Sequence, residues 1–233
     1  MKAQSVGLRA VIGFGVFMFL PPASLFIAAG RVDWVMGWVN TGLFVASIVG
    51  SRLIALRKNP DLIAERARAF QQGREGAKEW DQLLVGLVGL GGPLATWIVA
   101  GLDDRFGWSP EVPLAFQLIA LAAVVLGYVC AIWAMSANKF FSAVVRIQKE
   151  RGHTVVSDGP YRFVRHPGYA GGLLAMLATP LALASWWAFI PAGVIVLLTV
   201  IRTALEDRTL RQELPGYQEY AGRVRYRLLP GIW

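Results

Sequence analysis

Long apolar stretches divide this chain and confine most of its charged residues to short segments between them. A helix that crosses a bilayer needs about 20 mostly apolar residues, because the hydrocarbon core is roughly 30 Å thick and a helix rises about 1.5 Å per residue. The stretches without charge that suit this length are residues 10–30, 34–51 (to 56 if Arg52 snorkels), 82–102, 112–138 and 167–201. The pattern predicts an all-α integral membrane protein.

The last of these stretches is too long for one span. It contains Pro180 and Pro191, with Trp186-Trp187 between them. Helix breakers and an interfacial aromatic pair in the middle of an apolar run indicate two helices joined in a tight hairpin. The prediction is therefore about six transmembrane helices, or five plus a re-entrant hairpin.

Composition agrees, because 55% hydrophobic and 16% charged residues are too apolar for a soluble domain of 233 residues. The net charge of +8 would suggest nucleic acid in a soluble chain. Here, with the N-terminus placed in the cytoplasm, 21 of the 23 Lys and Arg residues fall on cytoplasmic segments, and only Arg31 and Arg105 lie outside. We predict cytoplasmic N- and C-termini and no nucleic-acid partner.

The chain offers little for metal or disulfide chemistry. Cys130 has no partner cysteine, and His153 and His166 alone cannot form a zinc site. The cofactor chemistry expected below therefore includes no metal.

Two regions are expected in the chain. Residues 1–135 would hold four transmembrane helices and a basic cytoplasmic loop, 57–81, on the substrate side. That loop has apolar residues at near-helical spacing, which favours an amphipathic helix on the anionic leaflet, with substrate gating as the alternative. Residues 136–233 would hold the cofactor-binding core, with the hairpin 167–201 and a cytoplasmic tail.

Glycines inside the apolar stretches suggest close helix packing rather than a nucleotide-binding loop, since none follows a strand. They include Gly15, Gly42, Gly89, Gly92 and Gly127.

The segment 153–171 concentrates candidate chemistry. Asp158-Gly159-Pro160 is typical of a turn, and Pro167 suits the first position of a helix, whose free N–H groups attract an anion. Arg165 beside it could bind a carboxylate, and Tyr161 and Tyr169 could place ring faces against a cation. Ordinary interfacial anchoring by Arg and Tyr is the alternative.

A second candidate lies at the end of the last predicted span. Arg202 and Glu206 are four residues apart and so share a helix face where membrane gives way to water. They form either a functional pair facing the bundle or an intrahelical ion pair. The tail 217–230 is basic and aromatic, which by composition indicates docking on the membrane surface.

In order and spacing, four blocks of the chain resemble the isoprenylcysteine carboxyl methyltransferase and phospholipid methyltransferase family of integral membrane methyltransferases. The blocks are His153–Val156 with Gly159-Pro160-Tyr161, Arg165–Tyr169 with Gly171, Arg202 with Glu206-Asp207 and Leu210, and the tail from Tyr217 to Pro230. The resemblance covers roughly residues 138–230.

This resemblance implies S-adenosyl-L-methionine as cofactor, in a cytoplasm-facing pocket that the tail covers. The implied cofactor contacts are His153, Thr154, Val155, Val156, Tyr161, Arg165, His166, Pro167, Gly168, Tyr169 and Glu206. The implied catalytic residues are Arg202, which would face the methyl acceptor, and Glu206. The chain departs from the family pattern at Asp207, where a second glutamate is usual, and at Arg146, where glutamine is frequent.

The expected function is methyl transfer to a lipophilic or lipidated acceptor at the cytoplasmic interface of a plasma, inner or internal membrane, with membrane lipids as partners. A carboxylate acceptor is already ionised and needs only orientation by Arg202, whereas an amine or thiol needs a base such as Glu206 or His166. Two alternatives stay open: an NADPH-dependent membrane reductase of the sterol reductase type, and a non-catalytic membrane scaffold.

Overall fold

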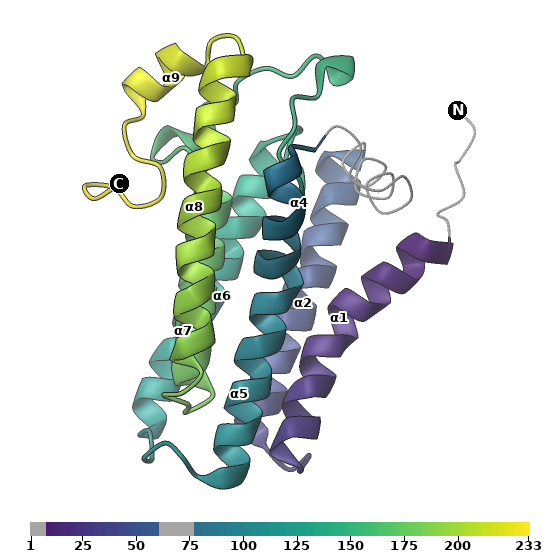
Figure 1. The fold of residues 1–233 in the computed structure, drawn as a ribbon, viewed down its shortest axis with the longest axis vertical. Helices are drawn as coiled ribbons and strands as arrows, with labels where there is room; N and C mark the ends of the chain where they lie inside the picture. The colour runs from purple at the N-terminus through teal and green to yellow at the C-terminus, as the bar shows by residue number, and fades with distance from the viewer. Residues whose placement is uncertain (1–7, 61–76) are drawn as a thin grey trace.

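The computed structural model describes residues 8–60 and 77–233, and this part of the chain is helical without any strand (Figure 1). Its helices are α1 (Leu8–Ala29), α2 (Val35–Lys58), α4 (Glu79–Gly86), the π-helical turn η1 (Leu87–Gly91), α5 (Gly92–Phe106), α6 (Leu114–Ala137), the 3₁₀ turns η2 (Lys149–Arg151) and η3 (Gly159–Arg162), α7 (Pro167–Ala182), α8 (Phe189–Glu213) and α9 (Tyr217–Arg223). The predicted amphipathic helix of the basic loop lies mostly outside the described residues.

Among the described residues, five helices are long and apolar enough to cross a membrane: α1, α2, the continuous run from α4 to α5, α6 and α8. The predicted all-α membrane fold is confirmed. The predicted break in 167–201 is confirmed too, because α7 and α8 form a hairpin that turns at residues 183–188 (Figure 1). With 16 residues, α7 is the short arm of that hairpin and falls below the length of the five candidate spans.

The long helices run up and down between the two ends of an elongated bundle (Figure 1). α1 packs against α5, and α6 packs against α2 and most extensively against α7. Many large apolar side chains on the long helices are exposed, as a lipid-facing surface requires; Ile27, Phe116, Ile119 and Leu197 are examples.

The end of the bundle at the α7–α8 turn is closed by a polar cluster. The buried Asp103 carboxylate accepts hydrogen bonds from the backbone N–H and hydroxyl of Ser109 and from the hydroxyl of Ser185. These contacts join the loop after α5 to the hairpin turn, so the two loops at this end are fixed to each other.

Two of the glycines named above do provide close packing, and others do not. A Cβ atom placed on Gly127 of α6 would lie 2.6 Å from the carbonyl oxygen of Gly171 on α7, and one on Gly92 would collide with Ile195 of α8. Around Gly15, Gly42 and Gly89 there is open space. The packing interpretation is therefore wrong for these three positions, which neighbouring helices do not approach.

The α6–α7 contact yields a prediction. Gly127→Ala should lower the free energy of unfolding by about 1–3 kcal/mol, because the new methyl group has to push two helix backbones apart. Thermal unfolding in detergent would measure this. Gly42→Ala, the same substitution in open space, should leave stability unchanged or raise it slightly. Equal melting temperatures for the two variants would contradict the close contact.

Candidate functional site

The end of α6, the start of α7 and the junction of α8 with α9 lie at the end of the bundle opposite the hairpin turn (Figure 1). Side chains from these segments line a pocket of about 810 Å³, a volume that includes the solvent at its open mouth. The lining combines aromatic, apolar and charged side chains, which suits a ligand with both polar and apolar parts.

Most of the residues predicted to bind cofactor line this pocket. They are His153, Thr154, Val155, Val156, Tyr161, Arg165, His166, Gly168, Tyr169 and Glu206. Two predicted residues lie outside the lining: Pro167, which occupies the first turn of α7 as the sequence predicted, and Arg202.

The loop between α6 and η3 forms one wall, and a buried glutamine organises it. The Gln148 side chain donates to the carbonyl of Phe140 (2.8 Å), and its backbone N–H donates to Nδ1 of His153 (3.3 Å). The His153 ring packs on Phe140 at a centroid distance of 4.5 Å. Burial and the nearby Arg146 and Arg151 lower the pKa of His153 to about 4, so its ring is neutral at pH 7.

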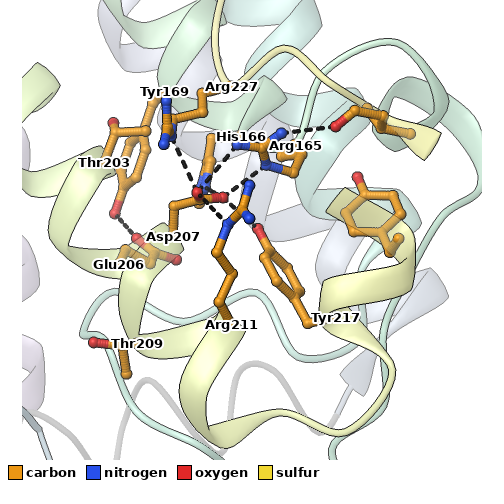
Figure 2. A network of polar contacts seen from close by, with 12 residues as sticks. Arg165, His166, Tyr169, Thr203, Glu206, Asp207, Thr209, Arg211, Tyr217 and Arg227 are labelled. Carbon is orange, nitrogen blue, oxygen red and sulfur yellow. Dashed lines mark hydrogen bonds and ion pairs between the residues drawn. The ribbon is translucent and has the colours of Figure 1, made fainter. Parts of the chain in front are cut away.

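Glu206 and Tyr169 face each other across the pocket. Glu206 lies on α8, and its carboxylate accepts a hydrogen bond of 2.6 Å from the hydroxyl of Tyr169 on α7 (Figure 2). Within the described part of the chain no Lys, Arg or His side chain forms an ion pair with Glu206. The pocket lining therefore contains a carboxylate that is hydrogen-bonded to a hydroxyl and forms no ion pair with a described side chain.

Arg202 lies beside this pair but bonds elsewhere. Its guanidinium sits 5.3 Å from the centre of the Tyr169 ring, while Nε and Nη2 donate to the two carboxylate oxygens of Asp81 at 2.6 and 3.2 Å. The intrahelical ion pair between Arg202 and Glu206, one of the two alternatives from the sequence, is therefore not formed. The two residues do share the face of α8 that meets α7.

Asp81 was missed by the sequence analysis. It is fully buried at the start of α4, where it also accepts the backbone N–H of Val145 at 2.7 Å. Its position in the sequence could have indicated it as a candidate, because an acidic residue directly before an apolar stretch is either exposed at the interface or paired inside the bundle.

A second buried carboxylate, Asp207, is the centre of a cationic cluster (Figure 2). Arg165 donates to it through Nε (2.7 Å) and Nη2 (3.1 Å), and Arg211, Arg227 and the Tyr217 hydroxyl donate at 3.1, 3.0 and 3.1 Å. Nε2 of the buried His166 lies 3.5 Å from the same carboxylate. Asp207 thus joins α8 to the segment just before α7, to α9 and to the end of the tail.

Arg165 does bind a carboxylate, as predicted, but the carboxylate belongs to the protein. Its Nη1 donates to the carbonyls of Val224 and Arg225, and its backbone N–H donates to the carbonyl of Tyr226. Because all these groups belong to α8 or the tail, Arg165 contributes to the pocket mainly by holding the tail in place.

The tail folds back over the site, in contrast to the membrane-surface docking that its composition alone suggested. Tyr217 and Tyr220 of α9 are buried and line the pocket, and the Tyr220 hydroxyl donates to the backbone carbonyl of Tyr161 at 2.7 Å. Burial raises the pKa of both tail tyrosines above the ordinary value of 10, so they are neutral donors at pH 7.

Other lining residues were not predicted as contacts. They are Asn138, Phe140, Phe141, Ser142, Val144, Val145, Arg146, Leu210, Leu214, Tyr217 and Tyr220. Arg146, doubtful from sequence, lines the pocket and forms an ion pair with Glu150 at 2.8 Å. Most of them are aromatic or apolar residues in segments that flank the motif residues, and this composition is the sequence feature that could have indicated them.

Comparison with known proteins places this site in a class. Residues 116–214, which include almost all of α6 and the whole of α7 and α8, match the family model described as phospholipid methyltransferase. The match contains most of the residues that line the pocket and most of the residues around Asp207, but it excludes Asp81.

The similar curated proteins carry a more specific name. The mouse protein-S-isoprenylcysteine O-methyltransferase is 35% identical over 147 residues, 56% of this chain and 47% of that protein. A probable protein-S-isoprenylcysteine O-methyltransferase from Oryza sativa subsp. indica is 32% identical over 114 residues, 46% of this chain and 57% of that protein. The chain thus spans about half the length of these relatives. The matches confirm the resemblance of this part of the chain to the family of membrane methyltransferases.

The Asp207 cluster gives a stability prediction. Asp207→Asn should lower the free energy of unfolding by about 3–5 kcal/mol, because it leaves buried Arg165 without its counter-charge. Thermal unfolding would measure the loss, and limited proteolysis should show faster cleavage in the tail. Glu213→Gln, which breaks the more exposed pair with Lys78 on the same helix, should cost only about 0–1 kcal/mol. Similar losses in both variants would contradict the central role of Asp207.

His153 gives a pH prediction. The pKa of His153 in the folded protein lies below the ordinary value of 6.5, so between pH 6.5 and about 4 the unfolded chain takes up a proton that the folded chain does not. This contribution favours the folded state fully above pH 6.5 and is lost as the pH falls. Melting temperatures of ligand-free protein at pH 5–7 should therefore fall less steeply for His153→Gln than for the wild type. Parallel pH profiles would show that His153 has no such role.

Proposed function

We propose that the protein transfers a methyl group from S-adenosyl-L-methionine to the carboxylate of an isoprenylcysteine-type acceptor at the membrane interface. The observation that carries the proposal is the pocket itself: it is formed by the family-matched segment, and its lining holds a carboxylate without a cationic partner among the described residues. The name of these relatives, protein-S-isoprenylcysteine O-methyltransferase, indicates an isoprenylcysteine as the class of acceptor.

The pocket chemistry fits this cofactor. Glu206 provides a negative charge for a ligand that carries a positively charged sulfur and an ammonium group. Aromatic residues, including Phe140, Phe141 and Tyr220, offer flat apolar surfaces for a purine ring. The amide of Asn138 and the exposed Thr154 add polar groups in the same lining. S-adenosyl-L-methionine would supply a methyl group bound to a positively charged sulfur. In an in-line displacement the methyl group goes to the acceptor, and the sulfur leaves as the neutral thioether of S-adenosylhomocysteine.

The protein's own part in the reaction is alignment and exclusion of water. A carboxylate acceptor is ionised at neutral pH, so no general base is needed. Arg202 is buried, and its Nη1 forms no hydrogen bond within the described residues, so we assign this atom to the acceptor carboxylate. The tail is held by Asp207 and Arg165, covers the pocket and helps to exclude water from the reacting groups.

We place the pocket on the cytoplasmic side. The segments at this end of the bundle, including the loop 138–166 and the tail, carry most of the basic residues, and basic loops favour the cytoplasm. Isoprenoid chains are apolar, so the acceptor would reach the site from the membrane with its carboxylate at the polar surface.

Ligand binding is the first test. Calorimetry on the detergent-purified protein should show binding of S-adenosyl-L-methionine and S-adenosylhomocysteine and no binding of NADPH. Glu206→Gln should weaken S-adenosyl-L-methionine about tenfold, because a charge-assisted contact is lost. Glu213→Gln, on the same helix but outside the pocket, should bind as the wild type does. Binding of NADPH in place of the two adenosyl ligands would make the protein a reductase instead.

Methyl transfer is the second test. With a labelled methyl donor and an isoprenylated cysteine, label should appear as a base-labile methyl ester. The same acceptor with its carboxylate already esterified should take up none. Arg202→Ala should abolish transfer; because it also leaves buried Asp81 unpaired and lowers stability, retained binding of S-adenosylhomocysteine is the control for its fold. Binding without transfer to this acceptor would keep the cofactor assignment and reject the carboxylate.

A further inference from the structure

The buried pair of Asp81 and Arg202 joins the site to a helix outside the matched family segment. Asp81 lies in α4, whereas Arg202 lies in α8, 121 residues later in the chain. The Asp81 side chain is fully buried, and its carboxylate has three donors: Nε and Nη2 of Arg202 and the backbone N–H of Val145. A carboxylate bound in this way is fixed in position.

Arg202 has a second anion within reach, and the geometry shows what keeps the two apart. Glu206 is one helical turn further along α8 on the same face, and Tyr169 bonds to Glu206 while its ring lies under the Arg202 guanidinium. Asp81 draws Nε and Nη2 of Arg202 toward α4, and the carbonyl of Ala143 accepts a further hydrogen bond from Nη2 at 2.8 Å.

We infer that Asp81 is a positioning residue that neutralises Arg202 and thereby leaves Glu206 available for a positively charged ligand. This inference rests on the proposed function and deepens it. Without the Asp81 charge, the nearest anion for Arg202 is Glu206, since the pair is spaced i, i+4 on one helix. Glu206 bound to Arg202 would lose its preference for a cation.

A second consequence concerns the wall of the pocket. Val144 and Val145 line this wall. The Asp81 carboxylate accepts the backbone N–H of Val145, and the Arg202 guanidinium donates to the backbone carbonyl of Ala143, so the ion pair holds the segment at two points. One buried ion pair therefore fixes both the wall and the charge state of the site.

The test compares two ligands that differ in charge at sulfur. S-adenosyl-L-methionine has a cationic sulfur and S-adenosylhomocysteine a neutral one, so the ratio of their dissociation constants reports the charge available at Glu206. In Asp81→Asn the affinity for the cationic ligand should fall about tenfold, with less than about a threefold change for the neutral one. A purely structural role would weaken both equally, and equal weakening or an unchanged ratio would overturn the inference.

Two further variants isolate the mechanism. Asp81→Asn combined with Arg202→Met removes both charges, which a buried ion pair often tolerates, and should restore the wild-type ratio. Lys78→Ala breaks the neighbouring contact between α4 and α8, the pair Lys78–Glu213, and should leave the ratio unchanged. No restoration in the double variant would contradict capture of Glu206 by Arg202.

Folding failure and failure of the proposed function give distinct results. If Asp81→Asn alone does not fold, the double variant Asp81→Asn with Arg202→Met tests the same link, because it removes the competing cation and leaves no buried charge unpaired. Its preference for the cationic ligand should equal or exceed that of the wild type, and a fall would overturn the inference. A wild-type protein that binds neither ligand would refute the proposed function and the inference with it. A wild-type protein that binds both while the ratio is the same in every variant would refute the inference alone.

Discussion

The site depends on a buried carboxylate, Asp207, that binds several cations at once. A charge in a low-dielectric interior is costly unless it is paired and fully hydrogen-bonded, and Asp207 meets this condition with donors from Arg165, Arg211, Arg227 and Tyr217. These donors come from the segment before α7, from α8, from α9 and from the end of the tail, so satisfying the carboxylate requires these segments to converge. Their convergence also brings the lining residues of the neighbouring pocket together.

The pocket divides its ionic groups between architecture and ligand binding. Arg165 and Asp207 satisfy each other, as do Arg202 and Asp81. Glu206 differs, because its carboxylate accepts a hydrogen bond from a tyrosine hydroxyl and forms no ion pair with a described side chain. In the function proposed above, this carboxylate sets the preference for a cationic ligand, while the two ion pairs hold the surrounding segments in place.

The sequence predicted the fold well because span length and charge distribution are local properties. The hairpin followed from Pro180, Pro191 and the tryptophans between them, and the helix start at Pro167 followed from its fixed backbone angle. The pairing of Asp81 with Arg202 could not be predicted in this way, since it joins residues 121 positions apart on helices whose rotation only packing determines. For the same reason the glycine pattern was reliable at Gly127 and misleading at Gly42.

The contact between Gly127 and Gly171 brings two helix backbones together with no side chain between them. Because the two backbones are already in contact at this point, neither helix can move closer to the other, and α6 and α7 form one rigid pair. The pair of helices reaches the pocket at Asn138, where α6 ends, and at Gly168 in the first turn of α7, which lies close to Phe141. Because the two helices can tilt in the bilayer only together, these lining residues keep their places relative to one another when the helices tilt.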